Sequence, residues 1–176
     1  MTPDSNPAVR SEALPGRYLT FTLGRESYGV PVLSVREIIR LCPITPVPQM
    51  PAHLRGVINL RGKVIPVLDL RAKFRLADGG YGDRACIILL QVGTPPGPVT
   101  LMGAIVDAVE EVVLLAASDL EGTPDFGGTP DTHFILGMAT VRGAVKTLLN
   151  LDAIFREEGT VSLPPVPARS PDSPQS

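Results

Sequence analysis

The sequence predicts an all-β fold with short helical turns, and three observations lead to this fold class. The 176 residues include 19 prolines and 17 glycines, about a fifth of the chain, and both residue types weaken the interior of a helix. The apolar runs are short and are separated by turn signals. The hydrophobic content of 44% is that of a globular protein, and the length fits one domain or two small ones.

Nine strands are expected along the chain, several of them joined by tight turns. Residues 24–26 and 61–63 each separate two β-rich runs and predict hairpins. Residues 35–41 have a mixed pattern that is compatible with a further strand or with one helical turn. Residues 121–133 hold two Thr-Pro-Asp triplets and a Gly pair, which predict a loop. The nine expected strands are 17–23, 27–32, 57–60, 64–68, 85–92, 99–106, 109–115, 136–141 and 145–149.

Two parts of the chain repeat one another. At an offset of 81 residues the segment 56–62 (GVINLRG) falls on 137–143 (GMATVRG). The apolar positions that follow continue to match, as far as Phe74 on Phe155. A run of this length is poorly explained by chance, and we interpret it as an internal duplication.

The duplication extends on both sides of this segment. Asp69 falls on Asn150, and because both are good N-cap residues, each half is expected to end in a short capped helical turn. A weaker match at an offset of 74 relates residues 29–38 to 103–112. Each unit has about 60 residues, which is close to the lower limit for independent folding. Two copies packed around a shared core are therefore predicted.

Composition and the scarcity of reactive side chains argue against several function classes. A net charge of −2 gives no basic field for nucleic acid. Cys42 and Cys86 have a spacing that matches no zinc or redox motif, and the two histidines, His53 and His133, stand alone in loops. Phosphate-binding, dinucleotide-binding and nucleophile-elbow motifs are missing from the sequence. We expect no enzyme activity, no metal and no cofactor.

Both ends of the chain are predicted to be tails. No secretory signal is visible at the N-terminus, and no apolar run is long enough to cross a bilayer, so we expect a cytoplasmic protein without direct membrane insertion. Prolines gather in both ends. We predict a flexible N-terminal tail at 1–16, a folded domain at 17–156, and a Pro/Ser-rich C-terminal tail at 157–176.

Three arginines stand beside glycines at expected turns: Arg55, Arg61 and Arg142. An arginine at a hairpin tip is usually solvated. Its planar guanidinium also suits a partner carboxylate, and arginine is enriched at protein interfaces. Both interpretations stay open from the residues alone.

With these segments in place, the sequence resembles the CheW family of bacterial chemotaxis coupling proteins. The resemblance rests on YLTFTLGRESYGVPVLSVREI (18–38), LRGVINLRGKVIPVLDLRAKF (54–74), GAIVDAVEEVV (103–113) and LLNLDAIF (148–155). It covers nearly all of residues 17–155, and the run GVINLRGKVIPVLDLR is the most specific part.

The resemblance implies a fold of two SH3-like five-stranded β-barrels, intertwined and packed around a shared hydrophobic core. It also implies a non-enzymatic adaptor that couples chemoreceptors, the methyl-accepting chemotaxis proteins, to the regulatory domain of the histidine kinase CheA. The expected partners are the receptor cytoplasmic tip and CheA, with assembly into rings or arrays associated with membrane receptors. The motifs do not place the kinase-contact positions.

The resemblance further implies that the receptor tip lies in the groove between the two barrels. Apolar side chains there would contact an amphipathic receptor helix, and Arg61 would pair with an acidic side chain near its hairpin tip. Carried over by motif, the receptor-binding positions are Val35, Glu37, Ile38, Gly56, Asn59, Arg61, Gly62, Gly103, Val106 and Val109.

Other functions remain as alternatives. The same fold would serve a CheA-type pathway outside flagellar chemotaxis, such as pilus motility or development. A barrel that binds nucleic acid would need aromatic side chains on a basic sheet, whereas aromatic residues make up 5% of this chain and tryptophan is missing. A fragment of a larger kinase would share the barrel, but the sequence shows no phosphate-cradling segment.

Overall fold

The computed structural model describes residues 13–50, 54–74, 76, 80–93, 98–122 and 134–157. The strands there are β1 (Gly16–Leu23), β2 (Glu26–Pro31), β3 (Val35–Arg40), β4 (Leu54–Leu60), β5 (Lys63–Asp69), β6 (Cys86–Val92), β7 (Thr100–Val106), β8 (Ala108–Leu115), β9 (Leu120–Glu121), β10 (Ile135–Val141) and β11 (Ala144–Leu149). The helices are the 3-10 turns η3 (Val32–Ser34) and η4 (Ala117–Asp119) and the α-helices α1 (Leu70–Lys73) and α2 (Leu151–Glu157). All nine expected strands are confirmed, and the ambiguous segment forms β3.

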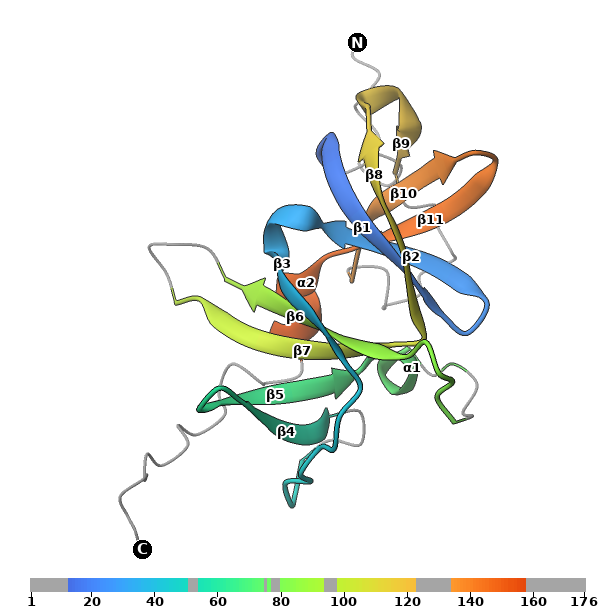
Figure 1. Cartoon of the computed structure of the whole chain (residues 1–176). Helices are drawn as coiled ribbons and strands as arrows, with labels where there is room; N and C mark the ends of the chain where they lie inside the picture. The colour runs from blue at the N-terminus through green and yellow to red at the C-terminus, as the bar shows by residue number, and fades with distance from the viewer. Residues whose placement is uncertain are drawn as a thin grey trace, which may run out of the picture.

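The strands form two sheets that lie one above the other, with α2 between them (Figure 1). One sheet has six strands in the order β8-β1-β2-β11-β10-β9, and the other has five in the order β3-β6-β7-β5-β4. The mainly β fold with two sheets is thus confirmed. The expected count of five strands holds for one sheet only, and in neither order does the last strand pair with the first. The SH3-like barrel form therefore stays a prediction.

The two repeats exchange their first hairpins. In the hairpin β1–β2 of the first repeat, β1 pairs antiparallel with β8 of the second repeat, and β2 pairs parallel with β11. In the hairpin β6–β7 of the second repeat, β6 pairs antiparallel with β3 of the first repeat, and β7 pairs parallel with β5. The duplication inferred from the sequence is therefore real, but each sheet contains strands from both repeats. Neither repeat can complete a sheet without the other.

Equivalent glycines lie where the exchanged hairpins meet their parallel partners. Gly29 of β2 is opposite Leu148, and Gly103 of β7 is opposite Val67. A Cβ atom on Gly29 would lie 2.9 Å from Leu148 Cδ2, and one on Gly103 would lie 3.0 Å from Ile87 Cγ2. A side chain at either junction would therefore require the neighbouring Leu148 or Ile87 side chain to shift.

Buried side chains form three clusters that follow this arrangement. The largest joins both sheets and both short helices and includes Phe21, Ile88, Met102, Leu149 and Phe155. A second lies against the six-stranded sheet and a third against the five-stranded sheet. The shared core predicted from the duplication is therefore the largest apolar cluster of the described residues.

Each short helix begins at the N-cap predicted for it. The Asp69 carboxylate accepts hydrogen bonds from the N–H groups of Arg71 and Ala72 at the start of α1, at 3.0 and 3.4 Å. The Asn150 side-chain oxygen accepts from the N–H of Ala153 in α2, at 3.2 Å. These bonds satisfy donors that the first turn of a helix leaves unpaired.

The helices also fix the turns of the exchanged hairpins. In α2, the Asp152 carboxylate accepts from the N–H of Gly93 at the end of β6, at 3.0 Å. In α1, the Arg71 guanidinium donates to Asp107 at 2.7 Å, and the other Asp107 oxygen accepts from the N–H of Gly24 in the β1–β2 turn at 2.6 Å. The nearly buried ion pair between Arg71 and Asp107 thus connects α1, the residue between β7 and β8, and the β1–β2 turn.

The predicted tails lie mostly outside the described residues, which begin at residue 13 and end at residue 157. Within the part assigned to the N-terminal tail, however, Ala13 is buried and Gly16 already belongs to β1. The expected loop 121–133 is described only at residues 121 and 122. Among the described residues, no helix has the length and apolar character needed to cross a membrane.

Replacement of Asp107 tests the connection between the sheets. We expect Asp107→Ala to lower the free energy of unfolding by about 3–5 kcal/mol, because the nearly buried Arg71 guanidinium loses its ion pair with Asp107. Chemical denaturation measures the change. The exposed acid Glu121 provides the control, since Glu121→Ala is expected to stay within about 0.5 kcal/mol of the parent chain. Equal effects of the two substitutions would contradict the role of Asp107.

Candidate interaction surface

The hairpin β4–β5 ends in a two-residue turn that presents an arginine to solvent. Arg61 and Gly62 both have positive φ, 52° and 88°, as a type I′ turn requires. The Asn59 side-chain oxygen accepts a hydrogen bond from the N–H of Gly62 at 3.1 Å and so holds the turn from within. Three of the ten predicted receptor-binding residues therefore form one structural unit.

A surface ion pair joins this turn to the edge strand of the same sheet. Arg61 Nη2 lies 2.5 Å from Glu37 Oε1 on β3, and the side chains are 69% and 38% exposed. An ion pair this exposed contributes about 0–1 kcal/mol to stability. Its main effect is to orient the guanidinium, whose five N–H donors are not all used by one carboxylate.

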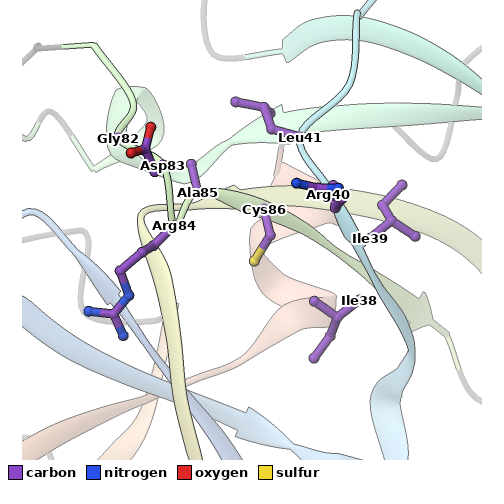
Figure 2. A pocket seen from close by; sticks show the side chains of 9 residues that line it. All are labelled: Ile38, Ile39, Arg40, Leu41, Gly82, Asp83, Arg84, Ala85 and Cys86. Carbon is purple, nitrogen blue, oxygen red and sulfur yellow. The ribbon is translucent and has the colours of Figure 1, made fainter.

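Ile38 lies at the rim of the shared core, beside Glu37 on β3. It pairs across the sheet with Ile88, which is buried in the shared core, yet Ile38 itself is 44% exposed. Figure 2 shows the side chains of Ile38 and Ile39 leaving β3 on opposite sides. Ile39 packs in the cluster of the five-stranded sheet, so Ile38 is the residue that remains for a partner.

A shallow hollow of about 370 Å³ lies beside Ile38, between the end of β3 and the segment that leads into β6 (Figure 2). Arg40 and Cys86 are opposite one another there. Burial raises the pKa of the Cys86 thiol, which keeps the thiol protonated near neutral pH and weakly nucleophilic. The hollow thus offers some apolar surface, two exposed cations, Arg40 and Arg84, and one exposed acid, Asp83, and no reactive thiolate.

Gly56 has a structural role that the sequence did not reveal. It lies at a bulge in β4 with a φ of 142°, and a Cβ atom there would lie 2.0 Å from the Thr45 carbonyl oxygen. Thr45 and Val57 exchange two backbone hydrogen bonds of 2.9 Å. The chain that leaves β3 is thereby held against β4, at the far edge of the same sheet.

The remaining predicted positions are less accessible. Val106 is 0% exposed and Gly103 is buried at the β5–β7 junction, so both lie in the core of the chain, and the receptor contact assigned to them by motif stays a prediction. Val35 and Val109 are half-buried and pack against the shared core. The apolar stretch 103–109 was an ambiguous signal, because strands buried on both faces also read as continuous apolar runs.

The family model described as the CheW-like domain matches residues 17–159. The chain belongs to the CheW-like family. Among its curated relatives, a chemotaxis protein CheW of Klebsiella aerogenes is 31% identical over 85% of this chain and 87% of its own length. A chemotaxis protein CheW of Rhizobium meliloti is 33% identical over 80% and 87%, respectively.

The fold agrees with that family. The crystal structure of a scaffolding protein, TtCheW of Thermoanaerobacter tengcongensis, superposes with a TM-score of 0.70 at 32% identity and covers 81% of this chain and 93% of that one. Protein FrzA of Myxococcus xanthus is 28% identical over 89% of this chain and 94% of its own length. This CheW-like chain is therefore of the chemotaxis scaffold or adaptor type.

Two features of the CheW-like surface were not found from the sequence. Val64 is exposed beside Asn59, its partner across the hairpin, and extends the apolar surface next to Arg61. Arg55 donates twice to the buried Asp69 carboxylate, at 2.7 and 3.0 Å, and so supports the N-cap of α1.

Replacement of Gly56 tests its role behind the surface. We expect Gly56→Ala to destabilise the fold by at least about 1–3 kcal/mol, because the φ is strained for alanine and the methyl group displaces Thr45. Gly80→Ala is the matched control, since a Cβ atom on Gly80 meets no atom within 4 Å and its φ is not positive. Chemical denaturation of both variants measures the difference. A Gly56→Ala protein as stable as the Gly80→Ala protein would show that the approach of Thr45 is dispensable.

Proposed function

We propose that this CheW-like protein is a non-enzymatic adaptor that couples chemoreceptors to the histidine kinase CheA. The observation that carries the proposal is an exposed corner, formed by Glu37, Ile38, Asn59, Arg61 and Gly62, within a chain of the scaffold type. The corner combines apolar surface, an oriented guanidinium and a rigid turn. These are features of a docking surface, and the one carboxylate of the corner, Glu37, is engaged in the ion pair with Arg61.

The receptor partner is an amphipathic helix of the receptor cytoplasmic tip. Ile38 provides apolar contact at the rim of the shared core, and Arg61 offers its remaining N–H donors to a carboxylate of the helix. Val35 and Val109 are half-buried against the shared core, and their remaining surface would add apolar contact to the helix. The position of Ile38 beside the core that joins the two sheets supports a groove between two barrel-like units as the place where the helix lies.

The kinase partner is the regulatory domain of CheA, with which the chain assembles into rings or arrays in the cytoplasm beside membrane receptors. A heterologous contact that closes on itself gives rings. The fold offers two curved sheets held in one body, so one partner on each side is compatible with its architecture. A CheA-type pathway outside flagellar chemotaxis is the second candidate, and the genes that neighbour the coding gene would distinguish the two.

Charge reversal at the corner tests receptor docking. We expect Arg61→Glu to weaken binding to a chemoreceptor cytoplasmic fragment, encoded in the same genome, at least tenfold, or about 1.4 kcal/mol. The pair with Glu37 is exposed, so the thermal melt should move by only a few degrees. Isothermal titration calorimetry measures the affinity. The matched control is Arg25→Glu, an exposed arginine in the β1–β2 turn. Equal binding by the two variants would refute the corner as the receptor site.

Coupling itself is tested by reconstitution. With receptor fragment and CheA present, addition of the chain should make kinase autophosphorylation depend on the receptor, because the adaptor holds both partners together. The Arg61→Glu variant should bind CheA and fail to give this dependence. Kinase activity that is unaffected by the wild-type chain, or no binding to either partner, would overturn the adaptor function.

A further inference from the structure

The six-stranded sheet has an open edge at β8. This strand pairs with β1 on one side, and no described strand pairs with its other side. Across a hollow of about 340 Å³ lies the end of β10, which the two-residue strand β9 covers only at Met138 and Ala139. Proteins usually cover an unpaired edge with a loop or a helix, because it can otherwise pair with other chains. A segment outside the described residues is therefore a candidate cover for β8.

The hollow beside this edge is apolar along β8 and carries more negative than positive charge. Leu114 lines it and is 73% exposed. Glu111 and Asp119 contribute two carboxylates, whereas Arg142 is the one cation of the lining and already pairs with Glu111. The Asp119 carboxylate accepts a hydrogen bond from the N–H of Ala116 at 2.8 Å and forms no ion pair with a described residue. An apolar and cationic occupant would therefore fit the hollow, and an acidic one would not.

The N-terminal segment of the chain is anchored beside this hollow. Ala13 is 7% exposed and packs in the apolar cluster of the six-stranded sheet. The chain then enters β1 with Gly16 directly opposite Leu115 at the end of β8. Three side chains belong to or pack against that cluster and also line the hollow: Val113, Leu115 and Val141. Residues 1–12, which precede Ala13, are therefore tethered at the hollow.

The residues just before Ala13 have the chemistry that the hollow accepts. Val9 is apolar and Arg10 is a cation, and they stand four and three residues before Ala13. An extended chain spans 3.3–3.6 Å per residue, so these two residues reach roughly 10–14 Å from the buried anchor. The C-terminal segment starts elsewhere, because it follows α2, whose buried residues pack in the shared core. The N-terminal segment is thus the better placed of the two.

From this placement we infer that residues 1–12 fold back over the hollow and cover the edge of β8, with Val9 against Leu114 and Arg10 paired with Asp119. Because the segment belongs to the same chain, its effective concentration at the hollow is on the order of millimolar, so weak contacts are enough to hold it. A partner that docks on this edge has to displace the cover first, which lowers its apparent affinity. The inference does not rest on the docking proposed at Arg61.

Hydroxyl-radical footprinting of the full chain, read by mass spectrometry, tests the cover. Leu33 in η3 is 93% exposed and serves as the internal reference. Without a cover, Leu114 and Leu33 should be oxidised to a similar extent, since both are largely exposed. With the cover, Leu114 should be oxidised at least about threefold less, which corresponds to a cover that is closed in about two thirds of the molecules. Val9→Asp and Arg10→Glu, which place a negative charge against the hollow, should each restore the oxidation of Leu114.

Matched controls lie in the C-terminal segment. Val161→Asp and Arg169→Glu make the same chemical changes there and should leave the oxidation of Leu114 as it is in the wild-type chain. The fully buried Leu23 should stay unoxidised in every variant, which shows that the fold is intact.

Four results would overturn the inference. Equal oxidation of Leu114 and Leu33 in the wild-type chain would show that residues 1–12 are a flexible tail. Protection of Leu114 that is lost on dilution would assign the cover to a second copy of the chain. Protection that is lost only in Val161→Asp or Arg169→Glu would assign it to the C-terminal segment. Protection that survives both Val9→Asp and Arg10→Glu would show that another contact covers β8.

Discussion

The exchange of hairpins between the two repeats is the constraint on which the rest of the structure depends. A repeat of about 60 residues is near the lower limit for folding alone. Here the first hairpin of each repeat completes the sheet of the other, and Gly29 and Gly103 lie in close contact with neighbouring side chains at the parallel junctions. The largest apolar cluster then forms between the sheets, where both repeats contribute to it. Folding of either half thus requires the other half to be in place.

This arrangement also explains how a chain with so few regular helices presents rigid surfaces. The edge strands β3 and β8 are each backed by a hairpin from the other repeat, so residues such as Ile38 and Val112 stand on a core that cannot move independently. The capped helices α1 and α2 hold the hairpin turns by carboxylates, in one case through Arg71 and Asp107. A scaffold that positions two partners relative to one another needs this kind of continuity between its faces.

Local features were largely predictable from the sequence, whereas long-range pairings were not. The Arg61–Gly62 turn, the N-caps at Asp69 and Asn150 and the duplication follow from residue types and fixed offsets. The offsets show that segments repeat, but they carry no information on which sheet a hairpin enters, because β2 and β11 pair across more than a hundred residues. The burial of Val106 was not predictable for a related reason, since an apolar motif residue can serve a partner or the core.

Hydrogen exchange at increasing denaturant concentration tests the central claim of one interdependent fold most directly. The slowest amides to compare are those at the junction of β2 with β11 and at the junction of β5 with β7, one in each sheet. Because each sheet is completed by the other repeat, both sets should exchange through a single global opening, with the same free energy and the same denaturant dependence. If the amides of one sheet exchange through a partial opening of lower free energy while the other sheet stays protected, the two sheets fold separately and the account is contradicted.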